Sequence, residues 1–480
     1  RNGKLSQLTD GGRAKTHNDN IYLQGQLVIH PMKGWNIYAE AGMRVINQNK
    51  QTNLNPIYEH DVNGNPLALA FSGSYSPGSS FARSAYQNSN FYTTSVYTDY
   101  TLQIKDHYFK ALVGMNTEEY IYRELAAQRP DVISSLVPEI SAATGEDKIN
   151  SSKYNDWSTA GFFGRLNYAY KDRYMAEVNV RYDGSSRFTR DNRWGFFPSV
   201  SAGWVISEEN FMKPTRKVLD FLKVRASYGL LGNQNIGNYP YAATIATGYG
   251  YYLGGDEADK ELVSGVAQTT LANSNISWEK SKQINFGIDF SLWNGLLSVT
   301  ADYYIKNIYD MLMKFPLPYY VGMSPAYTNA GDMSNKGWEV SVSHKNKLND
   351  FTYGVTFTLS DNRNKITNLN GLNSQDKTMV EGYPNKGIWG YVTDGYYKDW
   401  DDVNNSPKLG DARPGFVKYV KVYQGEDSDP MTIDTRDMVY LGDPFPHFEY
   451  GVTLNAGWKN FDFTAFFQGV GQRVNYMSGV

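Results

Sequence analysis

The sequence of 480 residues contains no cysteine, which excludes disulfide bonds and thiolate metal sites. It also has no run approaching the ~18 apolar residues of a membrane-spanning helix. A membrane β-barrel is still possible, because barrel strands need apolar residues only at every second position. The net charge is −3 and no basic tract is present, so nucleic-acid binding has no electrostatic support.

Recognisable catalytic motifs are lacking as well. The sequence has no HExxH, no GxSxG and no glycine-rich phosphate loop. Its six histidines are widely scattered, and none has a second histidine at metal-ligand spacing. A carboxylate pair of the glycosidase type cannot be matched from sequence, so that activity stays open. We nevertheless expect a protein that is not an enzyme and that holds no cofactor.

What the sequence does contain is a regular two-residue alternation. In residues 297–306, Leu297, Val299 and Ala301 alternate with polar side chains such as Ser298 and Thr300. Successive side chains of a strand point to opposite faces, so this segment has one apolar and one polar face. The same pattern predicts about 14 strands in all: 21–29, 35–41, 96–104, 109–115, 166–170, 174–182, 194–207, 222–230, 284–292, 297–306, 338–342, 351–359, 448–456 and 461–467.

The connections between these strands alternate between short and long. The short ones are Pro31–Gly34, Lys105-Asp106, Lys171-Asp172, Asn294-Gly295, Lys345–Asp350 and Lys459-Asn460, with a longer segment, Glu208–Leu219, where another short turn is due. The long ones are 44–90, 117–154, 184–193, 231–276, 307–334 and 361–445. In bacterial outer-membrane barrels short turns face the periplasm and long loops face outside.

The sequence therefore predicts an all-β fold, a transmembrane antiparallel β-barrel. Trp35, Tyr170, Tyr174, Trp293 and Trp458 lie beside the short turns, where an aromatic girdle is expected. The alternative is a water-soluble β-sandwich with tyrosines in its core. Long loops that recur at only one end of the strands argue against that alternative.

The direction of the strands gives a further expectation. The first predicted strand runs into a short turn and the last one leaves a short turn, so both ends of the chain fall on the extracellular side. An open sheet in lipid would leave unpaired backbone groups. We therefore expect residues 1–480 to be the barrel portion of a larger barrel, with its remaining strands elsewhere.

Several segments resemble the SusC/RagA family of TonB-linked outer-membrane proteins. The resemblance is dense over about residues 155–472 and looser before them. It rests on FFGRLNY (162–168), DGSSRF (183–188), WGFFPS (194–199), Gly203-Trp204, LKVRASYG (222–229), LGNQ (231–234), WEK (278–280), GWEV (337–340), Gly390-Tyr391, LGDPFP (441–446) and GWKNFD (457–462).

The resemblance implies a barrel of about 22 strands with a plug domain in its lumen. It also implies a TonB box, a SusD-like surface lipoprotein acting as a lid, and a possible dimer of that two-protein complex. No plug or TonB box is visible in this sequence. A departure from many relatives follows Pro414-Gly415, where they carry a calcium-loop-like stretch. Here the acids Glu426, Asp427 and Asp429 follow instead, at irregular spacing.

Those acids could bind a hard cation such as Ca²⁺ through their oxygens, but a solvated acidic loop is the alternative that we favour. Aromatic residues of the long loops are the candidate binding residues. Flat rings bury apolar area while their polar tips stay wet, which suits stacking on sugars or gripping peptides. The alternative is that they pack the loops or dock the lid. The candidates are Trp389, Tyr391, Tyr396, Tyr397, Trp400, Tyr249, Tyr251, Tyr319 and Tyr320.

The resemblance, together with the loop aromatics, thus implies a TonB-dependent importer of oligosaccharides, or alternatively of oligopeptides, in the bacterial outer membrane. A passive porin and a surface adhesin without transport are the rival functions.

Overall fold

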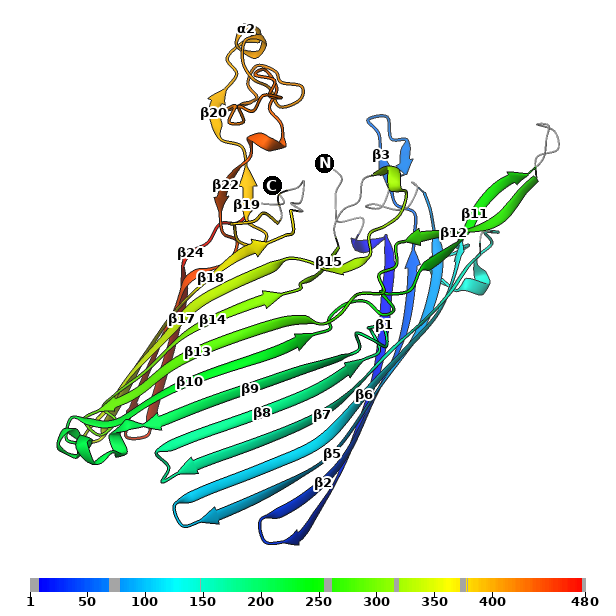
Figure 1. Cartoon of the computed structure of the whole chain (residues 1–480). Coiled ribbons are helices and arrows are strands. Elements are labelled where there is room, and N and C mark those ends of the chain that lie inside the picture. Colours follow the sequence, from blue (N-terminus) through cyan, green and yellow to red (C-terminus); the bar gives the residue numbers. More distant parts are fainter. Residues whose placement is uncertain are drawn as a thin grey trace. The chain divides into compact units, whose positions relative to one another are not determined.

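The fold is dominated by one antiparallel sheet (Figure 1). The computed structural model describes residues 8–68, 78–146, 148–253, 261–314, 319–371, 377 and 379–476. Within these residues, 14 long strands are hydrogen-bonded in the order β1-β2-β5-β6-β7-β8-β9-β10-β13-β14-β17-β18-β23-β24. Each predicted strand corresponds to one of them, so the all-β antiparallel prediction is confirmed.

The chain divides into two compact units, of which the first comprises residues 1–100, 112–164 and 182–187. It contains β1 (Gly12–Met32), β2 (Trp35–Leu54), the small hairpin β3 (Tyr58–His60) and β4 (Pro66–Ala68), most of β5 (Phe81–Ile104), β6 (His107–Pro130) and β7 (Ile149–Tyr170), and the short helix η1 (Ile140–Ala142). Strands β1 and β2 pair from Gly12–Leu54 to Met32–Trp35.

The second unit comprises residues 101–111, 165–181 and 188–480. Its long strands are most of β8 (Tyr174–Ser185), β9 (Trp194–Val205), β10 (Leu219–Asn233), β13 (Glu279–Leu292), β14 (Leu297–Tyr309), β17 (Asp332–Leu348), β18 (Phe351–Asn368), β23 (His447–Trp458) and β24 (Phe461–Gln472). Its shorter elements are η2 (Ile206–Glu208), η3 (Asn210–Thr215), β11 (Thr244–Leu253), β12 (Glu261–Thr270), β15 (Leu312–Lys314), η4 (Tyr319–Val321) and β16 (Tyr327–Asn329). Among the described residues, no helix has the length and apolarity to cross a membrane.

Many strands are longer than the sequence predicts. The first spans Gly12–Met32 rather than 21–29, and the predicted loop 44–90 is largely strand, since β2 continues to Leu54 and β5 begins at Phe81. The added residues, such as Gln48, Asn49 and Lys50, are polar on both faces. Only ~9–11 residues of a tilted strand cross the hydrocarbon core, and above it neither face needs to be apolar. The alternation therefore marks the membrane-spanning part and not the strand ends.

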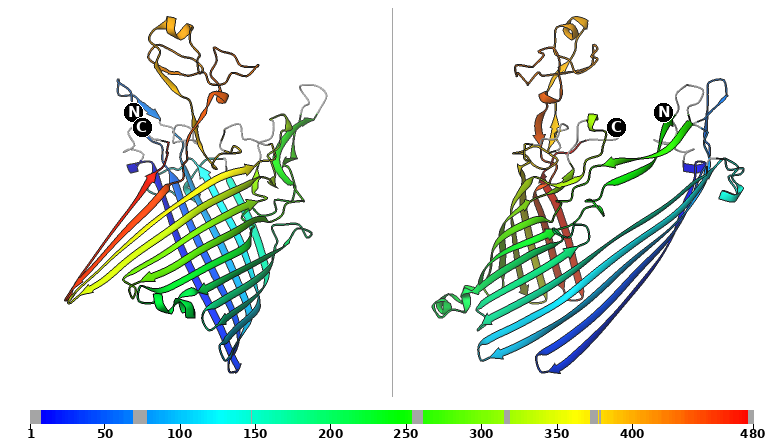
Figure 2. Two further views of the ribbon diagram at one scale, coloured as in Figure 1. Left: turned by 60° about the vertical axis from the view of Figure 1, so that its left-hand side comes forward. Right: turned by 45° about the vertical axis from the view of Figure 1, so that its right-hand side comes forward.

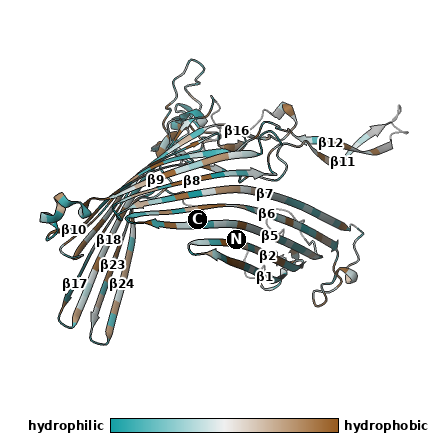
Figure 3. Cartoon of the chain, turned by 60° about the horizontal axis from the view of Figure 1, so that its bottom comes forward, coloured by the Kyte–Doolittle hydropathy of each residue, from teal (hydrophilic) through white to brown (hydrophobic). Residues whose placement is uncertain are grey.

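The short turns lie where the sequence predicts them, but the bounds of several differ: β1 continues to Met32, for example, so the predicted Pro31–Gly34 narrows to Lys33-Gly34. Asn294 and Gly295 both have positive φ, at 55° and 79°, as the Asn-Gly pair predicts for a tight hairpin. The predicted turn Lys345–Asp350 is wrong in its extent, because β17 continues to Leu348 and β18 starts at Phe351. The turn is Asn349-Asp350, and Asn349 takes the positive φ of 54°. Figure 3 shows hydrophobic and hydrophilic patches following each other along the strands that these turns connect.

A buried cluster of the second unit lies at the loop ends of its strands, and one of its members, Phe197, is on β9. Phe188, Phe197, Ile236, Ile276 and Trp278 form one cluster of buried side chains. The Trp278 indole N–H donates to the Arg193 carbonyl at 2.9 Å, which satisfies its polar group. The WGFFPS motif contributes Phe197 to this cluster, and the long connections contribute the other members. The motif therefore has a structural role at the loop ends of β9 and β10.

Candidate binding loop

The longest described excursion from the sheet connects β18 to β23; we call it the β18–β23 loop, and its described residues are 369–371, 377 and 379–446. Both views of Figure 2 show it projecting beyond the strand ends of the second unit. Its elements are β19 (Ile388–Gly390), β20 (Thr393–Tyr396), α2 (Trp400–Asn404), β21 (Val417–Tyr419), η5 (Thr435–Asp437) and β22 (Val439–Gly442). β19 pairs with β22, and β20 pairs with β21. The loop is therefore a folded module and not an irregular tether.

An aromatic cluster fastens the stem of this loop. The ring centroid of Trp389 lies 4.8 Å from that of Tyr383 and 5.7 Å from that of Tyr440. Lys377 Nζ lies 5.0 Å from the Trp389 ring and donates to the Met438 carbonyl at 2.9 Å. Burial lowers the pKa of Lys377. Trp389, a predicted ligand residue, thus packs inside the loop.

The next two predicted residues also have internal contacts. The Tyr391 ring lies 5.3 Å from the ring of Tyr419, and burial raises the pKa of Tyr391. Tyr397 is only 2 % exposed, and its hydroxyl donates to the Pro407 carbonyl at 2.6 Å. Tyr397 is placed to hold the outer part of the loop together.

Beside Tyr397 an ion pair closes the same region. Lys418 Nζ lies 2.8 Å from Asp402 Oδ1, and Lys418 holds the pKa of Asp402 at about 2. Asp402 also accepts hydrogen bonds from Lys398 N and Ser406 Oγ. The N-terminus of α2 is capped by Asp399, whose side chain accepts from Asp402 N at 2.8 Å.

Two predicted aromatics of the loop remain open to solvent. Tyr396 is 68 % exposed at the end of β20, and Trp400 is 60 % exposed at the start of α2. Tyr396 and Tyr397 are neighbours in an extended segment, so their side chains face opposite ways. The arrangement leaves Tyr396 exposed to solvent and places Tyr397 in the core of the loop.

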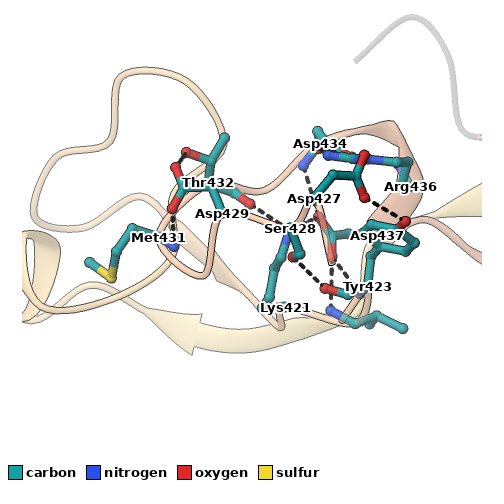
Figure 4. Close-up of polar contacts among 11 residues, drawn as sticks. Lys421, Tyr423, Asp427, Ser428, Asp429, Met431, Thr432, Asp434, Arg436 and Asp437 are labelled. Carbon is teal, nitrogen blue, oxygen red and sulfur yellow. Dashed lines mark hydrogen bonds and ion pairs between the residues drawn. The ribbon is translucent and has the colours of Figure 1, made fainter. Parts of the chain in front are cut away.

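The acidic segment of the loop is built around a buried carboxylate, Asp437, with no exposed side-chain area (Figure 4). Asp437 Oδ1 accepts from the N–H groups of Val422 and Tyr423 at 2.9 and 2.8 Å. Its Oδ2 accepts from Asp434 N and lies 3.0 Å from Lys421 Nζ. Burial by itself raises the pKa of Asp437, but these donors outweigh it and the pKa is lowered.

The three acids singled out as weak metal candidates do not converge. Asp427 lies 2.6 Å from Arg436 and accepts from the Tyr423 hydroxyl, whereas Asp429 accepts from Met431 N and Thr432 Oγ1. Glu426 is exposed. Within the described residues, no group of three His, Cys, Asp or Glu side chains is placed to hold a metal ion. Hydrogen bonds and ion pairs organise this segment.

The remaining predicted aromatics lie elsewhere in the second unit. Tyr249 and Tyr251, 45 % and 54 % exposed, are on β11, and Tyr320, 89 % exposed, is in η4. The side chain of Tyr319 lies outside the described part. The β11–β12 hairpin meets the segment after η4, because Ser324 N donates to the Thr269 carbonyl at 2.8 Å. These candidates form a second group, on elements separate from the β18–β23 loop.

The foot of the loop carries contacts that the sequence analysis missed. His447 lies between two carboxylates, with Nδ1 2.7 Å from Asp361 and Nε2 3.2 Å from Asp443. Tyr383 and Tyr440, which hold Trp389, were not singled out either. Asp443 is four residues from His447, but Asp361 lies at the opposite end of the loop, as Tyr383 does from Tyr440, so no local spacing predicts these meetings.

Comparison with known proteins agrees with this architecture. A family model described as "TonB dependent receptor-like, beta-barrel" matches residues 3–465. TonB-dependent receptor P3 of Formosa agariphila is 31% identical over 409 residues, covering 82% of this chain and 40% of that protein. TonB-dependent receptor SusC of Bacteroides thetaiotaomicron is 33% identical over 319 residues, covering 63% of this chain and 30% of that protein.

A solved structure described as the RagAB peptide transporter has the same fold. Its TM-score is 0.78 at 24% identity, and the match covers 96% of this chain and 48% of the solved one. The chain thus spans about half of that structure's chain, and less than half of the two curated relatives. The strand order, the short turns and the family match lead to one conclusion: this chain belongs to the TonB-dependent receptor family of outer-membrane β-barrels.

Proposed function

We propose that the whole protein imports oligosaccharides actively across the outer membrane, with oligopeptides as the alternative cargo. The observation that carries the proposal is the pair of exposed rings on a folded loop, Tyr396 and Trp400. Flat amphipathic rings bind sugar faces and extended peptides by stacking, and polar groups beside them give direction. The likeness to SusC, a TonB-dependent receptor, supports energised uptake, and the likeness to RagAB, a peptide transporter, supports the peptide alternative.

In the whole protein, residues 1–480 form barrel wall and extracellular loops. A plug domain, further strands and a TonB-contacting segment belong to the rest of the protein. A SusD-like lipoprotein covers the extracellular mouth, and the two-protein complex forms a dimer. The exposed rings of Tyr396 and Trp400 then bind either the cargo or the lid lipoprotein. Trp389, Tyr391 and Tyr397 keep the loop folded.

Coupling to the inner membrane is tested first. Uptake of a labelled oligosaccharide mixture, and in parallel of labelled peptides, is measured in cells with and without a functional TonB system. We expect uptake in cells lacking TonB to fall to the level of cells that lack this protein, because a plugged barrel does not open without energy. Uptake that survives would identify a passive porin, and normal uptake in cells lacking this protein would identify an adhesin.

The role of the rings is tested on the full-length protein. Tyr396→Ala and Trp400→Ala are each expected to weaken cargo or lid binding about tenfold, or roughly 1.4 kcal/mol, as for an anchoring aromatic. Affinity for the oligosaccharides and for the co-purified lipoprotein is measured by calorimetry. Phe211→Ala is the matched control, because Phe211 is 65 % exposed but lies in η3, on the short-turn side. Equal affinities for wild type and both loop variants would remove these rings from the site.

A further inference from the structure

The face of the sheet that carries Trp338, Val340 and Val342 is apolar, and we call it the outer face. Along β17 and β18 its paired residues are Leu348–Phe351, Asn346–Tyr353, His344–Val355, Val342–Phe357, Val340–Leu359 and Trp338–Asp361. Residues 338–348 match the ~9–11 residues with which a tilted strand crosses the hydrocarbon core. Trp338 therefore marks the extracellular boundary of the lipid-facing band, where interfacial aromatics are expected.

The outer face changes character one pair beyond Trp338. Lys336 is paired with Arg363, and the next pair on this face is Ser334–Lys365. The side chains of Lys336, Arg363 and Lys365 are all exposed. Residues paired directly across an antiparallel ladder lie about 4.5–5.5 Å apart, and like charges in such pairs are destabilising. Three cations are thus gathered at a cost to the fold.

A single carboxylate offsets part of this charge. Asp361 Oδ2 lies 3.2 Å from Arg363 Nε, while Asp361 Oδ1 is engaged by His447. Asp361 is only 6 % exposed, so it is fixed beneath the cations rather than free to neutralise all three. The cluster keeps an excess of positive charge at the level where lipid headgroups lie.

The cations border a groove of about 650 Å³. Its wall contains the aromatic side chains of Tyr303, Trp338 and Phe448, together with Lys336, Arg363 and Lys365. Tyr303 pairs with Trp338 across β14 and β17. The site is amphipathic, with apolar rings toward the membrane and cationic groups above them.

We propose that this groove binds a phosphorylated lipid of the outer leaflet, with its phosphate on Lys336, Arg363 and Lys365 and its acyl chains against Trp338 and Phe448. Charge complementarity favours an anionic headgroup, and clustered basic residues beside an apolar wall recognise such headgroups. The height of the groove, directly above the lipid-facing band, favours a lipid over a soluble anion. This site is independent of the cargo site proposed for the loops.

The full-length protein, purified from outer membranes, is titrated with monophosphoryl lipid A and with its dephosphorylated form, and adducts are measured by native mass spectrometry. We expect a bound phosphorylated lipid in the wild type and at least a tenfold weaker Kd in the triple variant Lys336→Gln, Arg363→Gln, Lys365→Gln. Lys306→Gln is the matched control. Lys306 lies at the same height, paired with Asn335, but on the polar face. It is expected to bind as the wild type does.

Unchanged affinity in the triple variant, or equal binding of the dephosphorylated lipid, would overturn the proposal. Heat-modifiable migration in gels reports whether each variant is folded. If the triple variant does not fold, Lys365→Gln alone decides: a weaker Kd supports the site and an unchanged one overturns it. Loss of self-association with unchanged lipid binding would also overturn it, because the groove would then bind a second copy of the protein.

Discussion

Replacement of Gly232 by alanine is expected to loosen the buried cluster at the loop ends of β9 and β10. A Cβ at this position would lie 2.1 Å from Cζ of the Phe197 ring. The Phe197 ring is confined on its other sides. It lies so close over Gly195 that a Cβ built there would be 2.3 Å from it, and Trp278 packs edge-on with ring centroids 5.2 Å apart. Overpacking of this kind costs about 1–3 kcal/mol. Hydrogen exchange of residues 230–241 and 276–278 should accelerate accordingly.

The matched control is Gly237→Ala, in the same long connection. No heavy atom lies within 4 Å of a Cβ built at Gly237. Its exchange rates should equal those of the wild type. A double variant, Gly232→Ala with Phe197→Leu, should recover part of the loss, since the shorter side chain withdraws from the new methyl group. Identical behaviour of the two glycine variants would show that the Phe197 ring has room to move.

Replacement of Asp437 by alanine is expected to unfold the acidic part of the β18–β23 loop. The change leaves Lys421, only 12 % exposed, without its carboxylate, and it removes the acceptor of three backbone N–H groups, those of Val422, Tyr423 and Asp434. Breaking such a buried pair costs about 3–5 kcal/mol. Limited proteolysis should cut the variant within the loop, while the sheet stays intact in heat-modifiability gels. Asp411→Ala removes an exposed carboxylate of the same loop, and this variant should resist proteolysis as well as the wild type does.

The same carboxylate gives the loop a defined acid sensitivity. Its pKa in the folded loop is lowered, so its contribution is fully present above the unfolded value, about 3.9, and is lost as pH falls through the folded value. Asp402 and Asp434, each with a pKa of about 2, act in the same direction. Pepsin cleavage of the loop should therefore increase from about pH 4 toward pH 2. Asp437→Asn should be cleaved already at pH 4 and show a shallower dependence, and a curve parallel to the wild type would contradict this account.

The membrane-spanning strands could be predicted because hydrocarbon on one face forces a strict alternation, as in Leu297, Val299 and Ala301. Their upper ends could not, because water on both faces removes that constraint: Gln48 and Lys50 are as acceptable in a strand as in a loop. The short turns indicated the antiparallel hairpins that they close, such as β13 with β14.

The loop residues were predictable by type but not by role. Trp389 is packed because Tyr383 and Tyr440 reach it from two separate segments, and no local pattern encodes that meeting. The neighbouring pair Tyr396 and Tyr397 did carry a signal, since adjacent side chains of an extended segment face apart. That Trp400 is exposed while Tyr397 is buried could not be predicted from the sequence, because it depends on how the loop folds.

The stem of the β18–β23 loop has a consequence for how such receptors diversify. β18 and β23 are neighbours in the sheet, and β19 and β22 pair above them, so the chain leaves and re-enters the wall at one place. Whatever lies beyond the stem can lengthen, shorten or change sequence without altering the register of any membrane strand. The wall and the β18–β23 loop can thus evolve at different rates, and under the function that we propose a new specificity requires the exchange of this loop rather than the redesign of a barrel.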